Sequence, residues 1–165
     1  MVDPRVRIGH VHLKVADLER SLAFYQGLHG FELTQRMGDQ AAFLSAGGYH
    51  HHIAINTWES AGGSRPQPGT TGLYHHAILY PDRPALARAV KRLGVAGWPL
   101  TGASDHGVSE AIYLDDPDGN GVELYRDRPP EEWPRAQNGE LQMVVRRLDL
   151  AGLLAEADAG GDGAR

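Results

Sequence analysis

The sequence has no cysteine among its 165 residues. This absence excludes disulfide bonds, thiolate metal ligands and cysteine nucleophiles, so any metal chemistry must use His, Asp, Glu or Tyr side chains. A basic block is also missing: 16 Lys and Arg stand against 21 Asp and Glu, for a formal net charge of −5. This charge balance argues against binding to a phosphate backbone, and we expect no nucleic-acid partner.

Long apolar runs are absent as well. The residues after Met1 read VDPRVR and lead into no hydrophobic stretch typical of a signal peptide or a membrane span, so we expect a cytoplasmic protein without a membrane partner. What the chain does contain is an ordinary apolar content, 41% hydrophobic residues, in a length that suits one domain or two small modules. The feature that needs an explanation is its nine histidines.

An internal repeat at an offset of 65 residues organises the chain. The segments IGHVHLKVADLERSLAFYQGLHG, residues 8–30, and LYHHAILYPDRPALARAVKRLG, residues 73–94, share a register in which His10 corresponds to His75. Each segment has the pattern of a strand followed by an amphipathic helix that ends at a glycine. The chain is therefore expected to contain two copies of one structural module.

Each copy continues with three short segments typical of strands. These segments are Phe31–Met37, Ala41–Ser45 and His51–Thr57 in the first copy, and Trp98–Leu100, Glu110–Leu114 and Gly121–Tyr125 in the second. The order strand, helix, strand, strand, strand predicts an α+β fold, in which two βαβββ modules form a curved mixed sheet around a cleft.

The expected domain boundaries follow from this order. The first module is expected at 5–58, a Gly/Pro/Ser-rich linker at 59–72 and the second module at 73–127. A C-terminal extension, 128–165, follows, and its short apolar run Leu148–Leu154 predicts an appendage that packs on the outside. We expect its Gly/Asp-rich end, 160–165, to be disordered.

Alternation along the strands indicates which side chains face the cleft. In the first strand the alternate apolar residues should meet the helix, so His10 and His12 point to the opposite face. The repeat assigns the same cleft-facing position to His75 and the helix side to His76. If the two modules enclose one cleft, His10, His75 and Glu123 converge there as two imidazoles and one carboxylate, which is a metal-ligand set.

Several motifs carry a family resemblance. The pattern H-x-x-x-x-V-x-D-L at His10–Leu18, together with DPDGNGVEL at Asp116–Leu124, resembles the vicinal oxygen chelate superfamily, and the likeness extends from Val6 to about Asp127. Within that superfamily, the segments GGYHHHIAINTW, GLYHHAIL and DHGVSEAIY are similar to bacterial single-unit members of the catechol 2,3-dioxygenase-like group.

The resemblance implies a divalent metal, Fe(II) or alternatively Mn(II), held in the cleft by His10, His75 and Glu123. Two imidazoles and one carboxylate leave one side of the metal open, as in non-haem iron oxygenases. The implied partners are a catechol-type diol, bound through its vicinal oxygens, and O2. The implied reaction is extradiol cleavage, in which the ring opens between a hydroxylated and an adjacent non-hydroxylated carbon.

The resemblance also implies catalytic side chains beside the metal. Tyr113 stands ten residues before the Glu ligand and is expected to hydrogen-bond a substrate oxygen. A proton-transferring His is expected in the run His50–His52, with His51 or His52 as the candidates. His106 is the candidate for a further His near Tyr113.

Two other functions remain open at this point. A glyoxalase-like isomerase or lyase would use the same fold with a fourth protein ligand, usually Glu, on the last strand of the first module, where this sequence has His52 or a neighbour. A metal-free, ligand-sequestering protein of the drug-resistance type would keep the cleft alone, and the intact donor set argues against it. The cleft can form within one chain or between exchanged modules of a homodimer.

Overall fold

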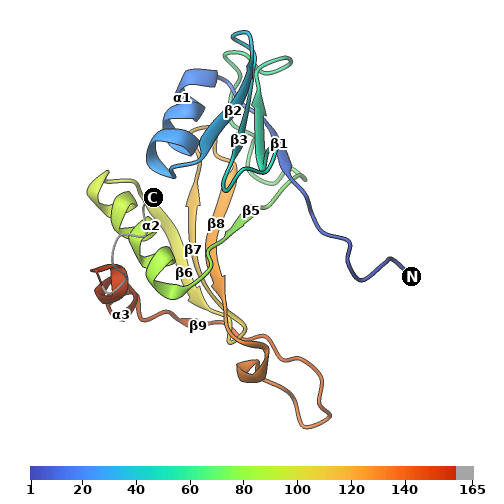
Figure 1. The fold of residues 1–165 in the computed structure, drawn as a ribbon, viewed down its shortest axis with the longest axis vertical. Coiled ribbons are helices and arrows are strands. Elements are labelled where there is room, and N and C mark those ends of the chain that lie inside the picture. Colours follow the sequence, from blue (N-terminus) through green and yellow to red (C-terminus); the bar gives the residue numbers. More distant parts are fainter. Residues whose placement is uncertain (159–165) are drawn as a thin grey trace. The chain divides into compact units, whose positions relative to one another are not determined.

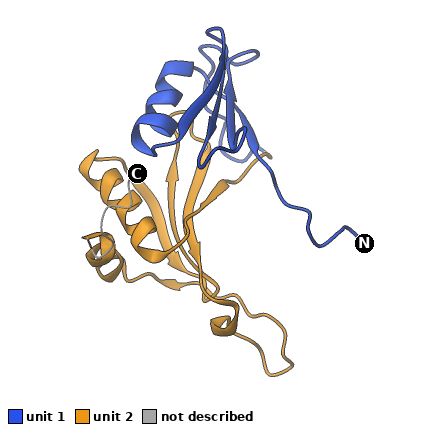
Figure 2. Cartoon of the chain, viewed as in Figure 1, with its two compact units in different colours: residues 1–70 blue, residues 71–165 orange. Residues whose placement is uncertain are grey.

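A computed structural model describes residues 1–158 and divides the chain into two compact units (Figure 2). The division falls between Thr70 and Thr71, inside the segment 59–72 that the sequence indicates as a linker. The Gly/Asp-rich end, 160–165, for which disorder is expected, lies outside the described residues.

The first unit contains one helical segment and four strands (Figure 1). Its elements are β1 (Val11–Lys14), α1 (Leu18–Leu22), η1 (Ala23–Leu28), β2 (Glu32–Met37), β3 (Ala41–Ser45) and β4 (Ile53–Asn56). Asp17 caps α1, because its carboxylate accepts a hydrogen bond of 2.9 Å from the Arg20 amide. The strands form one mixed sheet in the order β1-β4-β3-β2, in which β1 and β4 are parallel and the other pairs are antiparallel.

The second unit repeats this arrangement and adds to it (Figure 1). Its elements are β5 (His76–Leu79), α2 (Arg83–Val95), β6 (Leu100–Asp105), β7 (Ser109–Asp115), β8 (Gly121–Asp127), η2 (Pro130–Glu132), β9 (Arg146–Arg147), α3 (Leu150–Ala155) and η3 (Glu156–Asp158). The sheet order is β5-β8-β7-β6-β9, with β5 parallel to β8. Both units are thus βαβββ modules, and the predicted α+β fold class is confirmed.

One face of each sheet is closed by its helix. In the first unit α1 contacts β3 and β4, and in the second unit α2 contacts β8. The largest side chains buried in this way include Tyr25, Phe24, Leu44 and Ile55 in the first unit and Leu86, Leu93, Ile112, Leu114 and Leu124 in the second. Each such side chain stabilises the fold by about 1.5–3 kcal/mol relative to an exposed position, so both modules have a core of their own.

The two sheets match each other in register. Neighbouring positions on β1, β4 and β3 form what we call row 1, and the equivalent positions on β5, β8 and β7 form row 2. Row 1 consists of His12, Ala54 and Phe43, and row 2 consists of Ala77, Glu123 and Tyr113. The irregularities of strand pairing correspond as well. The strand next to each row has a register shift, between Leu33 and Gln35 on β2 and between Leu100 and Gly102 on β6.

Two strand boundaries differ from those expected. β4 begins at Ile53, so His51 and His52 lie in the loop before the strand and not on it. The expected strand Trp98–Leu100 overlaps β6 only at its last residue, because Gly97 turns the chain with a φ of 66° and the Trp98 indole donates to the Asp115 carbonyl at 2.9 Å. Side-chain hydrogen bonds of this kind are not visible in a hydropathy pattern.

The C-terminal extension is integrated into the second unit, where the sequence predicted an outside appendage. β9 pairs with β6 and becomes the edge strand of the sheet, and α3 and η3 pack on α2. Arg83, at the start of α2, makes ion pairs with Glu110 on β7 and with Glu156 of the extension. No pattern in the sequence predicts this strand of two arginines, because β9 exists only through its pairing with β6.

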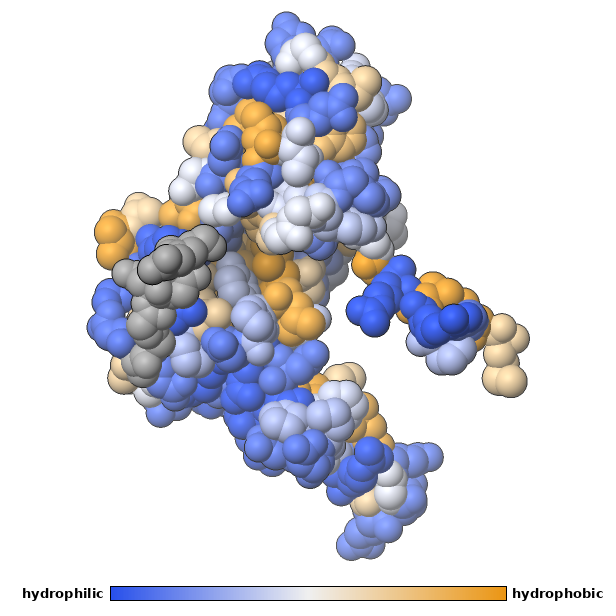
Figure 3. All heavy atoms as spheres, in the orientation of Figure 1, coloured by the Kyte–Doolittle hydropathy of each residue, from blue (hydrophilic) through white to orange (hydrophobic). Residues whose placement is uncertain are grey.

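The described residues also bear on the expected absence of a membrane span. No helix within 1–158 combines the length and the apolar character needed to cross a bilayer. Residues 1–10 contain neither helix nor strand and carry apolar and charged side chains together, among them the exposed Ile8. Figure 3 shows hydrophobic and hydrophilic residues together on one face of the molecule.

Candidate metal centre

His75 and Glu123 meet on the face of the second sheet that lies opposite α2. His75 directly precedes β5, and the pairing of Ala77 with Glu123 places all three residues on one face. The His75 Nε2 atom lies 2.9 Å from Glu123 Oε2, and the glutamate side chain is only 13% exposed. A nitrogen donor and an oxygen donor are therefore brought together as the alternation predicts.

Gly121 allows this approach. A Cβ atom at position 121 would lie 2.2 Å from the Tyr74 carbonyl oxygen and 3.0 Å from the His75 Cβ. Any larger residue at the start of β8 would push away the backbone that carries the imidazole. The glycine of the DPDGNG turn thus positions the histidine on the neighbouring strand.

The donors of this pair fit a divalent metal ion. His75 meets the carboxylate through its Nε2 nitrogen, and a divalent ion can bind an imidazole nitrogen together with a carboxylate oxygen. The other ring nitrogen, His75 Nδ1, is buried and makes no hydrogen bond within the described part of the chain. Imidazole with carboxylate is the donor combination of non-haem iron sites.

Tyr113 and His106 extend the pair into a chain of polar contacts. The Tyr113 hydroxyl lies 3.1 Å from Glu123 Oε1 and 2.7 Å from His106 Nε2. Burial and the nearby negative charge of Glu123 raise the pKa of Tyr113 to about 12, so its hydroxyl keeps its proton at neutral pH. The structure thus connects Tyr113 and His106 to the glutamate.

In the first unit His10 is accompanied by His51. His10 directly precedes β1, at the position equivalent to that of His75 before β5, and its ring centre lies 4.4 Å from that of His51. The His51 ring also packs on Phe43 at 5.2 Å. Burial, followed by the proximity of His10, lowers the pKa of His51 and favours its neutral, proton-accepting form.

The neighbouring histidines of the run also have partners of their own, and His50 contacts His51, with 2.7 Å between the two Nδ1 atoms. His52 Nδ1 lies 3.2 Å from Ser45 Oγ and accepts a bond of 3.3 Å from the Ala46 amide, which ties the loop before β4 to the end of β3. The His50 carbonyl accepts a bond of 2.9 Å from Thr34 Oγ1. Three consecutive histidines have no periodicity that could distinguish them, so only the folded loop identifies His51 as the neighbour of His10.

The structure adds an aromatic wall that the sequence analysis did not single out. The His12 ring contacts Trp58 edge-on, with ring centres 5.6 Å apart, and lies 6.3 Å from Phe43. His12 Nε2 also lies 2.9 Å from the Asn56 side-chain amide. The phenylalanine on the central strand and the tryptophan after β4 were visible in the sequence only as apolar residues, without a sign that they share a face with His12.

The predicted ligands are divided between the units, with His10 in the first and the other two in the second. No group of three or more His, Cys, Asp or Glu side chains within residues 1–158 has the geometry of a metal site. What the structure brings together is the pair His75 and Glu123, and the three-ligand centre stays a prediction.

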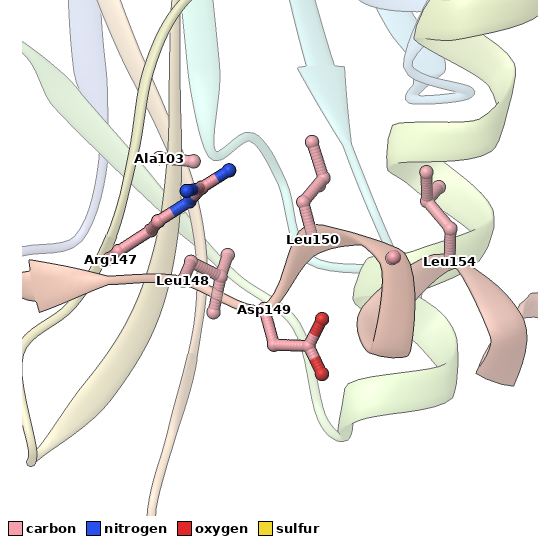
Figure 4. A pocket seen from close by; sticks show the side chains of 7 residues that line it. Ala103, Arg147, Leu148, Asp149, Leu150 and Leu154 are labelled. Atoms are coloured by element: carbon pink, nitrogen blue, oxygen red, sulfur yellow. The ribbon is translucent and has the colours of Figure 1, made fainter.

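A hollow elsewhere in the second unit contains none of these residues. It has a volume of about 760 Å³ and is lined by Ala103, Arg147, Leu148, Asp149, Leu150, Ala151 and Leu154. Figure 4 shows Leu150 and Leu154 projecting from the same side of α3. This surface belongs to the C-terminal extension and is distinct from the pair of donors.

The chain is similar in sequence to several proteins that are named as dioxygenases. A model of the Glyoxalase/Bleomycin resistance protein/Dioxygenase superfamily matches residues 7–124. A catechol-2,3-dioxygenase of Bacillus subtilis (strain 168) is 44% identical over 150 residues, 91% of this chain and 52% of that protein. A biphenyl-2,3-diol 1,2-dioxygenase 3 of Rhodococcus globerulus is 30% identical over 138 residues, 81% of this chain and 71% of that protein.

Solved structures share the fold. A glyoxalase/dioxygenase from Nostoc punctiforme superposes with a TM-score of 0.62 at 21% identity, covering 78% of this chain and 97% of the other. At this identity the likeness concerns the fold alone. The chain spans about half the length of the Bacillus relative.

Proposed function

The chain belongs to the Glyoxalase/Bleomycin resistance protein/Dioxygenase superfamily, and on this premise we propose that it is an extradiol ring-cleaving dioxygenase. In this proposal the substrates are a catechol-type aromatic diol and O2, and the metal is Fe(II), with Mn(II) as the alternative. The observation that carries the proposal is the contact of His75 with Glu123, whose other carboxylate oxygen contacts Tyr113. The relatives named as diol dioxygenases support it.

His10, His75 and Glu123 are the residues that would hold the metal in this proposal. A divalent iron bound by two imidazoles and one carboxylate would offer its open side to the two diol oxygens and to O2. The protein itself supplies two nitrogen donors from equivalent positions of the repeat, and one carboxylate that is largely shielded from water.

The remaining steps belong to residues of this chain. His51, held neutral by burial and by its histidine neighbours, is placed to accept a proton from a substrate hydroxyl and later to return one. Tyr113 keeps its hydroxyl proton at neutral pH and is placed to hydrogen-bond a substrate oxygen as charge develops on it. The wall of Phe43, His12 and Trp58 offers apolar ring faces to an aromatic substrate.

Row 1 disfavours the glyoxalase-like alternative. The position on β4 that corresponds to Glu123 on β8 is Ala54, which is completely buried and has no donor atom. His52 or a neighbour was the expected occupant of this position, and His52 instead bonds the loop at Ser45 and Ala46. Without a fourth protein ligand at this position, three ligands and an open metal side are favoured.

Oxygen uptake tests the proposal. The full-length protein is loaded anaerobically with Fe(II), its iron content is measured, and a panel of catechols is supplied in an oxygen electrode. We expect uptake of one O2 per diol and a coloured ring-opened product, with a Mn(II)-loaded sample as the comparison for the metal. Iron-loaded protein that consumes no O2 with any diol, but isomerises a glutathione hemithioacetal, would instead establish the alternative.

A further inference from the structure

His106 makes two hydrogen bonds with one residue of the C-terminal extension, Val144. Its Nδ1 atom lies 3.0 Å from the Val144 carbonyl oxygen, and its own carbonyl accepts a bond of 3.0 Å from the Val144 amide. A carbonyl oxygen can only accept, so the proton of neutral His106 is on Nδ1. Nε2 is then the acceptor that faces the Tyr113 hydroxyl at 2.7 Å.

The C-terminal extension also packs against the turn between β6 and β7 that carries His106. Gly107, the residue after His106, has a φ of 76°, and a Cβ atom there would lie 2.6 Å from Pro134 Cγ and 3.1 Å from Val144 Cγ2. The Arg128 side chain donates to Asp105 at 2.8 Å. Segment 128–147 therefore packs closely on the turn that carries His106, with its own backbone against the imidazole.

The tautomer of His106 decides how the Tyr113 hydroxyl can bond. The single hydroxyl hydrogen has two acceptors in reach, His106 Nε2 at 2.7 Å and Glu123 Oε1 at 3.1 Å. If the proton of His106 moved to Nε2, the imidazole would become a donor to Tyr113, and only the glutamate would be left to accept. The Val144 carbonyl excludes this second tautomer because it needs a hydrogen on Nδ1.

We propose that the two residues of the C-terminal extension that contact the His106 turn, Pro134 and Val144, position the active site: they select the Nδ1-protonated tautomer of His106 and thereby keep its Nε2 atom as an acceptor beside the Tyr113 hydroxyl. The catalytic meaning of this role rests on the proposed function, whereas the tautomer itself does not. His106 and Val144 act through Tyr113 and are positioning residues.

Two glycines of similar conformation provide the test. Gly107→Ala introduces a Cβ against Pro134 and must displace the extension, whereas Gly139→Ala, at a φ of 84°, meets nothing within 4 Å. Both variants carry the backbone strain of an alanine at positive φ, so only the first changes the contact with His106. A double variant, Gly107→Ala with Pro134→Ala, removes the proline ring atoms and should relieve the displacement.

The first readout is the His106 tautomer in full-length protein without added metal. Long-range ¹H–¹⁵N spectra distinguish Nδ1-protonated from Nε2-protonated imidazole, and the His106 signals are assigned by their loss in His106→Gln. We expect the Nδ1-protonated form in the wild type and in Gly139→Ala, a mixture in Gly107→Ala, and recovery in the double variant. An Nε2-protonated wild type would overturn the proposal even if Gly107→Ala fails to fold.

The second readout is turnover of the iron-loaded enzyme. We expect Gly107→Ala to lower kcat by about tenfold with a smaller change in KM, and the double variant to recover part of this loss. Equal kinetics and equal tautomers in Gly107→Ala and Gly139→Ala would refute the positioning role. A tautomer change in a protein that turns over no diol would leave the positioning role intact and refute the proposed function.

Discussion

Row 1 and row 2 occupy the same strand positions in two sheets of the same topology, yet their chemistry differs. Row 2 carries the carboxylate of Glu123 and the hydroxyl of Tyr113, and the equivalent places in row 1 hold Ala54 and Phe43. Each half keeps a histidine directly before its first strand. The duplicated fold therefore supplies symmetric nitrogen donors, and the asymmetry of the rows assigns the only carboxylate to the second half.

The segments that precede the rows differ in a second way. Before β8 the Asp116 carboxylate is occupied by its own turn, since it accepts bonds from the amides of Asp118 and Asn120 and from the Asn120 side chain. Before β4 the chain instead carries the histidine run, with His51 against His10. The second turn fixes the register of Glu123, and the first loop brings the His51 imidazole beside His10 and His50.

We expect the largest effect from substitutions of the proposed metal ligands in the second unit. His75→Ala and Glu123→Ala should each abolish tight iron binding and with it all turnover, because each removes one of the three proposed ligands. The matched control is His76→Ala, one residue along the chain and on the opposite face of β5. Iron content after desalting checks this, and equal metal loss in His75→Ala and His76→Ala would contradict the assigned faces.

The loop of the first half is tested by exchanging its histidines one at a time. His51→Asn should lower kcat by roughly 10²–10⁴ while iron stays bound, as expected for loss of a group that transfers a proton. His52→Asn should change kcat far less, because His52 bonds the loop and not His10. Steady-state kinetics at equal iron content measure the difference. A larger loss in His52→Asn would reverse the assignment.

On the helix-facing side, the second sheet carries His76 at the position where the first sheet has Val11. Burial lowers the pKa of His76 to about 4. The unfolded chain, with a pKa near 6.5, binds the proton more readily, so stability falls as the pH drops from about 6.5 to 4. The expected loss is about 3 kcal/mol at the lower pH. Denaturant unfolding across this range should show a weaker decline in His76→Val, and an unchanged decline would contradict the burial of the imidazole.

Reciprocal Tyr and Phe substitutions in the two rows test the contribution of the Tyr113 hydroxyl alone. Tyr113→Phe makes row 2 resemble row 1, and we expect a drop in kcat/KM of about 10- to 100-fold with iron retained, the range for a hydrogen bond to a charged group. Phe43→Tyr adds the hydroxyl to row 1, where no carboxylate accompanies it, and should leave metal content unchanged. Comparable losses of activity in both variants would mean that the rows do not differ in function.

Much of the fold was predictable because it depends on local pattern. The repeat, the helix after each first strand, and the shared face of His75 and Glu123 follow from period-two and helical alternation, which adjacent residues determine. The shift of β6 from Trp98–Leu100 to Leu100–Asp105 was not predictable, since a glycine turn and an indole hydrogen bond set it. The same holds for β9, whose two residues are a strand only because β6 is beside them.

The candidate site likewise has parts that the sequence predicted and parts that only the structure shows. The family resemblance implied Tyr113 beside Glu123, and the structure pairs the two residues directly on the neighbouring antiparallel strands β7 and β8. The resemblance left His51 and His52 as equal candidates, and it could not relate His106 to Val144, which is 38 residues away. Contacts across such separations depend on how the loops close, and no local pattern records that.

The sequence by itself determined that two similar modules exist, that histidines occupy equivalent places before their first strands, and that one of the modules ends in a strand with a carboxylate. These properties are periodic or duplicated, so neighbouring residues encode them. Tertiary structure decided which histidine of the run accompanies His10, that Ala54 occupies the position on β4 equivalent to Glu123 on β8, and that the C-terminal extension hydrogen-bonds His106. Each of these depends on side chains and backbone groups that become neighbours only when the chain has folded, through hydrogen bonds that a one-dimensional pattern does not contain.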